Sequence, residues 1–93
     1  MYLHIGGGYS VPVVWICGIF DLDRATEEGS TTLDFLVEAQ SMGQVRTIGH
    51  DLPRSFLLLV DGTIYLSPIS TYTLRERLRR GGDNALLMED YED

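Results

Sequence analysis

The chain has 93 residues, a formal net charge of −7 at pH 7 and 44% hydrophobic residues, which fits one folded domain and excludes a chain that is disordered throughout. No apolar run reaches the roughly 18–20 residues that span a bilayer, and no basic segment with a long apolar core opens the sequence, so we expect neither a membrane span nor a signal peptide. The single cysteine, Cys17, excludes an internal disulfide framework and suits a reducing compartment, so we expect a cytoplasmic protein.

The negative charge is concentrated at the C-terminal end. Residues 81–93 contain five of the 14 acidic residues and no basic residue, whereas residues 1–80 contain the other nine acids and all seven basic residues, which are arginines. The charge of residues 1–80 is therefore near −2. We predict one domain over residues 1–80 and an acidic extension over residues 81–93. A strongly acidic surface repels nucleic acid, but a nearly neutral body with local arginines need not.

The first part of the chain predicts two strands separated by a glycine turn. Residues 1–5 alternate between apolar and polar side chains and are rich in strand formers, so they predict a strand. Residues 6–8 are three glycines, which adopt turn conformations that other residues avoid. Residues 13–21 are largely apolar and β-branched and predict a buried strand, with Pro12 at its beginning.

Two later stretches have helical periodicity. Residues 31–42 predict a central helix. Its apolar positions fall on one face; they are Leu33, Leu36 and Val37, with Phe35, Ala39 and Met42 beside it. Residues 71–80 predict a C-terminal helix. Ser70 would be its N-cap, and Ile69 and Leu74 would form a hydrophobic staple.

The segment between these helices predicts strands. Residues 44–49 can form a short strand. Residues 56–61 and 63–67 are apolar runs joined by Asp61-Gly62, a dipeptide typical of tight hairpin turns. Taken together, the elements predict a small single α+β domain with a mainly antiparallel sheet, one central helix and one C-terminal helix.

No group of residues predicts catalysis or metal binding. The three glycines lack the Gly-Lys-Ser/Thr ending of a phosphate loop. Cys17 lies in an apolar strand and is expected to be a buried thiol, and its spacing from His4 and His50 matches no metal signature. Asp21 and Asp23 share one side of a strand and can act as acid and base or bind a cation, but charges bordering a loop explain them as well. We therefore expect no enzyme activity, no cofactor and no metal.

Four segments occur in an order and spacing that resembles a known family. They are MYLHIGG, GIFDLD, LPRSFLL and YLSPISTYTLRER, and the resemblance as a whole extends over about residues 1–79. In these segments the chain resembles the extracellular matrix regulatory protein family of bacteria, the RemA/RemB type, and is most similar to the RemB branch. The resemblance implies a small cytoplasmic α+β domain associated with transcription of biofilm-matrix genes. It also implies, from the RemA branch, assembly into closed rings that bind DNA through arginines repeated around the ring.

The arginines that the resemblance implies are mostly replaced here. One is expected just ahead of the GIFD segment, where this chain has Val13 to Trp15. Two more are expected before the FLLLV segment, near Leu52 and Pro53, and only Arg54 keeps a positive charge there. The resemblance therefore supports the same fold for this chain more strongly than it supports DNA binding through the same positions.

Two functions from different classes follow. The first is an oligomeric transcription regulator that binds double-stranded DNA, with the candidate contacts Arg54, Arg46 and Arg24. The second is a protein-interaction or assembly module without DNA affinity of its own, which co-assembles with a basic paralogue. In both, we expect a homo-oligomer, because a short chain has little core and because the resemblance implies a ring.

The densest basic cluster is expected to serve the protein itself. Its arginines lie near the C-terminal end of the second helix, where the helix dipole favours cations; they are Arg75, Arg77, Arg79 and Arg80. Glu76 and Arg80 form an i, i+4 pair, and the acidic residues 81–93 can fold back onto the cluster. The alternative is that the cluster is the DNA site and that the acidic extension masks it.

Overall fold

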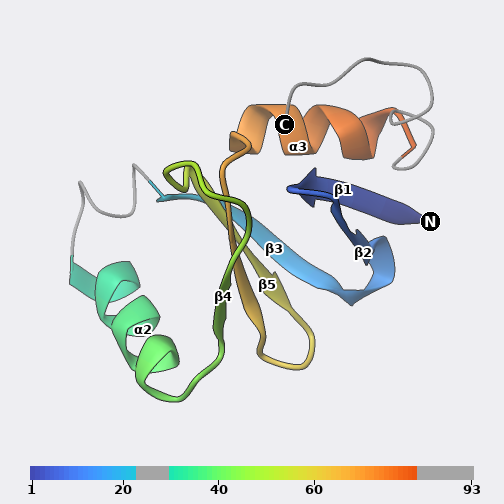
Figure 1. The fold of residues 1–93 in the computed structure, drawn as a ribbon. Helices are drawn as coiled ribbons and strands as arrows, with labels where there is room; N and C mark the ends of the chain where they lie inside the picture. The colour runs from blue at the N-terminus through green and yellow to red at the C-terminus, as the bar shows by residue number, and fades with distance from the viewer. Residues whose placement is uncertain (23–29, 82–93) are drawn as a thin grey trace.

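A computed structural model describes residues 1–22 and 30–81 of the chain (Figure 1). It is an α+β fold, as the sequence predicts. The elements in chain order are β1 (Tyr2–Gly6), β2 (Tyr9–Pro12), the short 3-10 helix η1 (Val13–Trp15), β3 (Ile16–Asp21), α2 (Ser30–Ser41), β4 (Val45–Thr47), β5 (Ser55–Leu59), β6 (Ile64–Ser67) and α3 (Thr71–Arg79).

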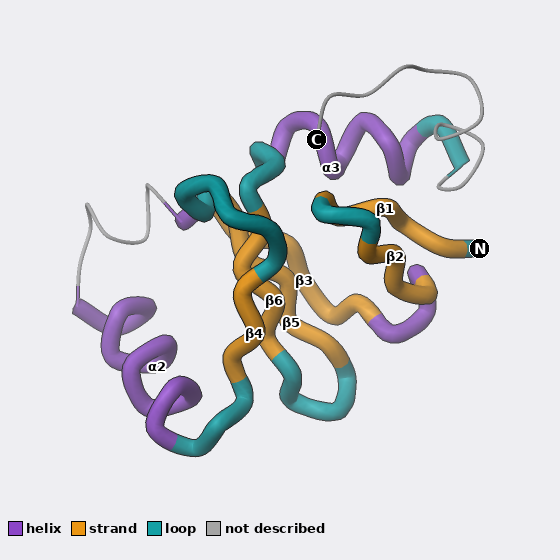
Figure 2. Tube along the Cα trace, in the orientation of Figure 1, coloured by secondary structure: helices purple, strands orange, loops and turns teal. Residues whose placement is uncertain are grey.

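The strands form two sheets. Strands β1 and β2 pair as an antiparallel hairpin, and the other four form a sheet in the order β3-β5-β6-β4. In this larger sheet only β4 and β6 run parallel, so the prediction of a mainly antiparallel arrangement is confirmed. Figure 2 shows the larger sheet between α2 on one side and the β1–β2 hairpin with α3 on the other.

The N-terminal hairpin corrects the predicted second strand. Residues 13–21 are not one strand: η1 comes first, and β3 begins only at Ile16. The unpredicted strand β2 precedes them and ends at Pro12. The reason is the glycine turn, because Gly6, Gly7 and Gly8 all have positive φ (107°, 59° and 81°) and turn the chain back along β1.

The core consists of two clusters, one on each face of the larger sheet. Adjacent residues of a strand point to opposite faces, and β5 illustrates this with Leu57 and Phe56. Leu57 belongs to the cluster beneath α3 and the β1–β2 hairpin, whose buried members are Leu3, Ile5, Val11, Ile48, Leu57, Ile69 and Leu74. Phe56 belongs to the smaller cluster on the α2 side, with Ala39 and Ile64.

Helix α2 leaves most of its apolar surface uncovered. Among the apolar side chains of α2 that the structure describes, only Ala39 is buried, and Leu36 packs partly against the smaller cluster. The other apolar side chains of this segment have exposed fractions from 42% to 67%; they are Leu33, Phe35, Val37 and Met42. Apolar residues span more of the helix circumference than the neighbouring sheet can cover, and the short β4 is the main contact.

The β5–β6 hairpin is antiparallel, as predicted, but its turn is longer than a two-residue loop. The strands end at Leu59 and resume at Ile64. Gly62 N–H donates to the Leu59 carbonyl at 2.9 Å, and Gly62 has a φ of 93°, whereas Asp61 has no positive φ. A turn of this kind needs only one residue with positive φ, and Gly62 is that residue. Asp61 therefore does not adopt the positive φ that a two-residue turn would require of it.

Helix α3 begins and packs as the sequence predicts. The Ser70 side chain accepts a hydrogen bond from Thr73 N–H at 3.2 Å, which caps the helix. Ile69 and Leu74 are both buried in the larger cluster, in agreement with the predicted staple. The connection from β6 is fixed by a buried serine, because Ser67 Oγ donates to the Ile5 carbonyl at 2.8 Å.

Candidate nucleic-acid interface

Arg54 lies at the end of the loop that leads into β5. Its backbone is held on both sides: Arg54 N–H donates to the Ser67 carbonyl at 2.8 Å, and the Arg54 carbonyl accepts from Leu22 N–H at 3.1 Å. Its side chain is exposed. The loop is therefore rigid where the arginine is attached, while the guanidinium remains accessible to a ligand.

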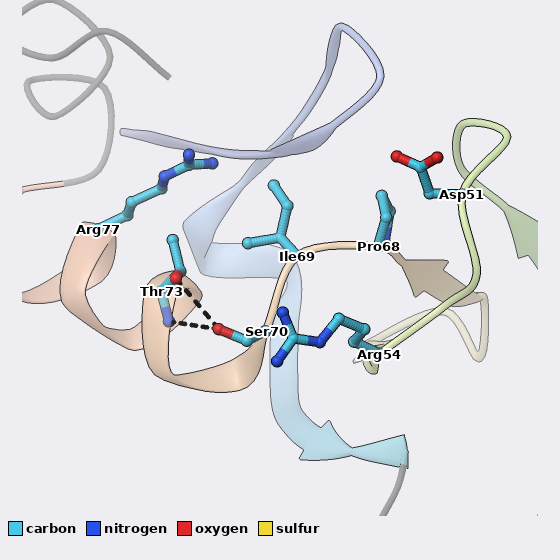
Figure 3. Close-up of a pocket in the computed structure, with 7 residues that line it drawn as sticks. All are labelled: Asp51, Arg54, Pro68, Ile69, Ser70, Thr73 and Arg77. Atoms are coloured by element: carbon cyan, nitrogen blue, oxygen red, sulfur yellow. Dashed lines mark hydrogen bonds between the residues drawn. The ribbon is translucent and has the colours of Figure 1, made fainter. Parts of the chain in front are cut away.

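A pocket of about 220 Å³ lies between this loop and the start of α3. Figure 3 shows the Arg54 side chain extending toward Ser70, the N-cap of α3. The first-turn N–H groups of a helix and its dipole favour a negative charge, and the guanidinium adds a full positive charge there. Asp51 lines the same pocket, and its carboxylate opposes the attraction for an anion. The arrangement suits one weak phosphate contact.

Arg77 lines the same pocket but is turned inward. Its side chain is 93% buried, since only 7% is exposed. Its Nη1 donates to the His4 carbonyl at 3.1 Å and lies 3.2 Å from His4 Nδ1. In Figure 3 its guanidinium points away from Arg54, toward the β1–β2 hairpin. Arg77 therefore joins α3 to β1, a contact that the sequence does not predict.

The end of α3 carries a surface ion pair. Arg79 Nη2 and Glu76 Oε1 are 2.6 Å apart, and this hydrogen bond, with the charges of Arg79 and Arg80, holds the pKa of Glu76 below its ordinary value. The predicted partner was Arg80. Arg80 is the C-cap of α3, and its charge contributes to the lowered pKa of Glu76, whereas the 2.6 Å ion pair is with Arg79.

The other candidate arginines do not join Arg54. Arg46 is exposed on β4, where its Nη1 donates to the Gly43 carbonyl at 3.2 Å. It is level with Tyr65 of β6, whereas Arg54 precedes Ser55, which is level with Ser67. The two arginines are thus separated by about 10 Å along the strands and about 10 Å across them. Arg24 lies outside the described residues, as does the acidic extension from residue 82 onward.

The positions where the family resemblance implies further arginines are apolar and exposed. Val14 and Trp15 have exposed fractions of 82% and 51%, and Leu52, beside the pocket loop, has 84%. Cys17, expected to be buried, is exposed at an irregularity of the edge strand β3 between Ile16 and Gly18. Apolar sequence alone does not reveal this exposure, because it depends on where β3 lies in the sheet.

Two kinds of site are absent from the part of the chain that the structure describes. Within residues 1–22 and 30–81, no three His, Cys, Asp or Glu side chains group closely enough to hold a metal ion. None of the helices formed by these residues is long and apolar enough to span a bilayer. Of the carboxylate pair suggested by the sequence, Asp21 ends β3, and Asp23 lies outside the described residues.

No protein-family model and no curated protein matches this chain.

Proposed function

We propose that this chain is a bacterial transcription regulator of extracellular-matrix genes that works as a homo-oligomeric ring in the cytoplasm and binds double-stranded DNA weakly through Arg54. The resemblance of four segments to the RemA/RemB type supports the regulatory role. The observation that supports the DNA contact is the position of Arg54. Its backbone is fixed between β3 and β6, and its side chain extends beside the N-cap Ser70 of α3.

Exposed apolar surface and an open strand edge support oligomerisation. Strand β3 is at the edge of the larger sheet, so it presents backbone groups that a neighbouring strand can pair with. Phe20 of this strand is 44% exposed although it stacks on Phe56 with ring centroids 4.9 Å apart. Helix α2 adds exposed Phe35, and exposed Met42 follows directly after it. Burying such surface between subunits supplements the small core of a short chain.

A ring would make a weak phosphate contact useful. One surface arginine supplies little affinity, but identical contacts on every subunit act together once the first is made. The contact is to phosphate, so binding should be sequence-tolerant and should weaken steeply with salt. The opposing Asp51 limits the affinity of each single pocket.

Arg54→Ala tests this function. We expect it to weaken binding of a labelled duplex to a similar degree for every sequence, measured by fluorescence anisotropy between about 50 and 200 mM salt. Arg75→Ala is the matched control, because it removes the same charge from an exposed position on α3. Light scattering should give the same oligomeric mass for both variants. Equal losses for the two variants, or wild-type binding that salt does not weaken, would reject the role of Arg54.

The second candidate is an assembly module without DNA affinity that joins a basic paralogue. The exposed Leu52 beside Arg54 and the carboxylate of Asp51 in the same pocket favour it. This function predicts no DNA binding by the chain alone. It also predicts a mixed oligomer, detected by light scattering, when the chain is combined with a basic RemA-type protein.

A further inference from the structure

The tip of the β5–β6 hairpin and η1 form a second pocket, far from Arg54. Val60 N–H donates to the Trp15 carbonyl at 2.8 Å, which fixes the two segments side by side. Trp15, Leu59, Val60 and Asp61 line the resulting pocket of about 230 Å³. Trp15 is 51% exposed and Val60 is 63% exposed. The pocket thus offers an accessible indole, an aliphatic wall and one carboxylate.

The carboxylate of Asp61 is fixed and ionised. Its Oδ1 accepts a hydrogen bond from Thr63 N–H at 2.9 Å, and this bond holds the pKa of Asp61 below its ordinary value. The negative charge is therefore present at neutral pH. Among residues 1–22 and 30–81, no arginine lies within ion-pairing distance of Asp61, so the attraction for a cation is not used within the described part of the chain.

The chemistry of these walls selects one kind of ligand. An aromatic face attracts a cation that lies over it, an aliphatic wall suits the methylene stem of a long basic side chain, and a carboxylate pairs with its charged head. A guanidinium combines stacking on an indole with planar hydrogen bonding to a carboxylate, which an ammonium does not. An anionic or purely apolar ligand would instead desolvate Asp61 without compensation.

We propose that the pocket lined by Trp15, Val60 and Asp61 binds an arginine side chain from a basic segment of a partner protein. The guanidinium lies against the Trp15 indole and pairs with the Asp61 carboxylate, while its stem contacts Val60. The carboxylate of Asp61 in the pocket lining favours a basic partner over an acidic one. The site is separate from the proposed DNA contact, because Arg54 and Asp61 lie at opposite ends of β5, roughly 20 Å apart.

Trp15 supplies a direct assay, since it is the only tryptophan of the chain. The full chain is titrated with the peptide acetyl-Gly-Arg-Gly-amide while tryptophan fluorescence is followed. We expect a saturable change in the millimolar range, as for one exposed cation–aromatic contact with one ion pair. The matched peptide with citrulline in place of arginine keeps the shape without the charge and should bind roughly fivefold more weakly.

Three variants test which side chains of the pocket bind the peptide. Asp61→Asn keeps a side-chain oxygen for Thr63 N–H, so the turn should persist, and it should weaken the arginine peptide roughly fivefold. Asp34→Asn removes one exposed carboxylate from α2 and should leave the titration unchanged. In the wild type, the peptide should shift the amide NMR signals of Val60 and Gly62. In Trp15→Leu, these shifts should be absent.

Three results would overturn the proposal. The first is no saturable response up to about 50 mM peptide, and the second is equal binding of the arginine and citrulline peptides. The third is an oligomeric mass of Asp61→Asn that is lower than that of the wild type. Such a loss would mean that a second copy of the chain occupies the pocket. None of these results depends on Arg54, so this proposal and the proposed DNA contact fail independently.

Discussion

Arg77 and His4 are 73 residues apart in the sequence, yet one guanidinium nitrogen of Arg77 lies 3.1 Å from the His4 carbonyl oxygen and 3.2 Å from its ring Nδ1. The contact joins α3 to β1 across the edge of the larger core cluster. A charged side chain that is 93% buried is stable only when its hydrogen bonds are made, because desolvation of an unsatisfied charge is costly.

Arg77→Ala should therefore destabilise the domain by about 2–3 kcal/mol, since it removes charge-assisted hydrogen bonds and leaves the His4 carbonyl without this donor. Urea denaturation at fixed protein concentration measures the loss. Arg75→Ala, at an exposed position of the same helix, should change the free energy of unfolding by less than about 0.5 kcal/mol. Equal effects of the two variants would show that the contact with His4 contributes nothing to stability.

The glycine turn gives a second prediction. A Cβ on Gly7 would lie 3.0 Å from Ile48 Cγ2 and 3.3 Å from Gly49 N, whereas a Cβ on Gly8 would meet nothing within 4 Å. Both glycines have positive φ, so both alanine variants should lose about 1 kcal/mol from backbone strain. Gly7→Ala should lose about 1–2 kcal/mol more, because buried Ile48 and the backbone beside it must move. Thermal unfolding of the two variants in parallel checks the difference, and a larger loss for Gly8→Ala would contradict it.

The pKa of Asp61 predicts a pH dependence of stability. It lies below the ordinary value of 3.8, mainly because Thr63 N–H donates to the carboxylate. A lowered folded-state pKa contributes stability above the unfolded-state pKa, and this contribution is lost as the pH falls below about 4 through the folded-state pKa. Asp61→Asn should therefore approach the wild type in stability as the pH is lowered from about 6 to 2.5. Urea midpoints at each pH measure this, and a difference that stays constant would contradict it.

The response to salt should distinguish the cause of the lowered Asp61 pKa from the cause of the lowered Glu76 pKa. The pKa of Glu76 is also lowered, mainly by its hydrogen bond with Arg79, with the charges of Arg79 and Arg80 contributing. Exposed charge pairs are screened by salt, whereas a hydrogen bond from the backbone is screened much less. The effect of Glu76→Gln on the pH dependence should therefore shrink at about 0.5 M NaCl, while the effect of Asp61→Asn should persist. Equal sensitivity to salt would show that the Asp61 effect is a general charge effect.

The uncovered surface of α2 predicts where the subunits of the proposed oligomer meet. Met42→Glu places a charge on the apolar side beside Phe35 and Ala39, with which Met42 lines a pocket. We expect this variant to lower the oligomeric mass measured by light scattering while the circular dichroism spectrum stays folded, because Met42 is 67% exposed within the chain. Ser41→Glu is the matched control: it adds the same charge one residue earlier, on the polar side of the helix. An unchanged mass for both variants would exclude this face of α2 from the interface.

Several local features followed from the sequence alone. The hairpin between β5 and β6, the cap of α3 at Ser70 and the reversal at residues 6–8 depend on residues within a few positions of one another. Turn glycines, capping hydroxyls and runs of apolar residues act over that range, so a sequence pattern is enough to place them. The exposed Arg54 could be proposed for the same reason, because a charged residue after Pro53 in a loop stays in water.

Other features were decided only by the tertiary structure. The sequence did not reveal β2, the exposure of α2, the exposed Cys17 or the inward turn of Arg77. Each depends on which elements pack against one another. An apolar residue is buried only if another element covers it, and an arginine is buried only if hydrogen-bond acceptors lie within its reach. Trp15 and Asp61 are the clearest case. Each looked unremarkable in its own segment, and they line one pocket only because β3 pairs with β5 and brings the start of one strand to the turn after the other.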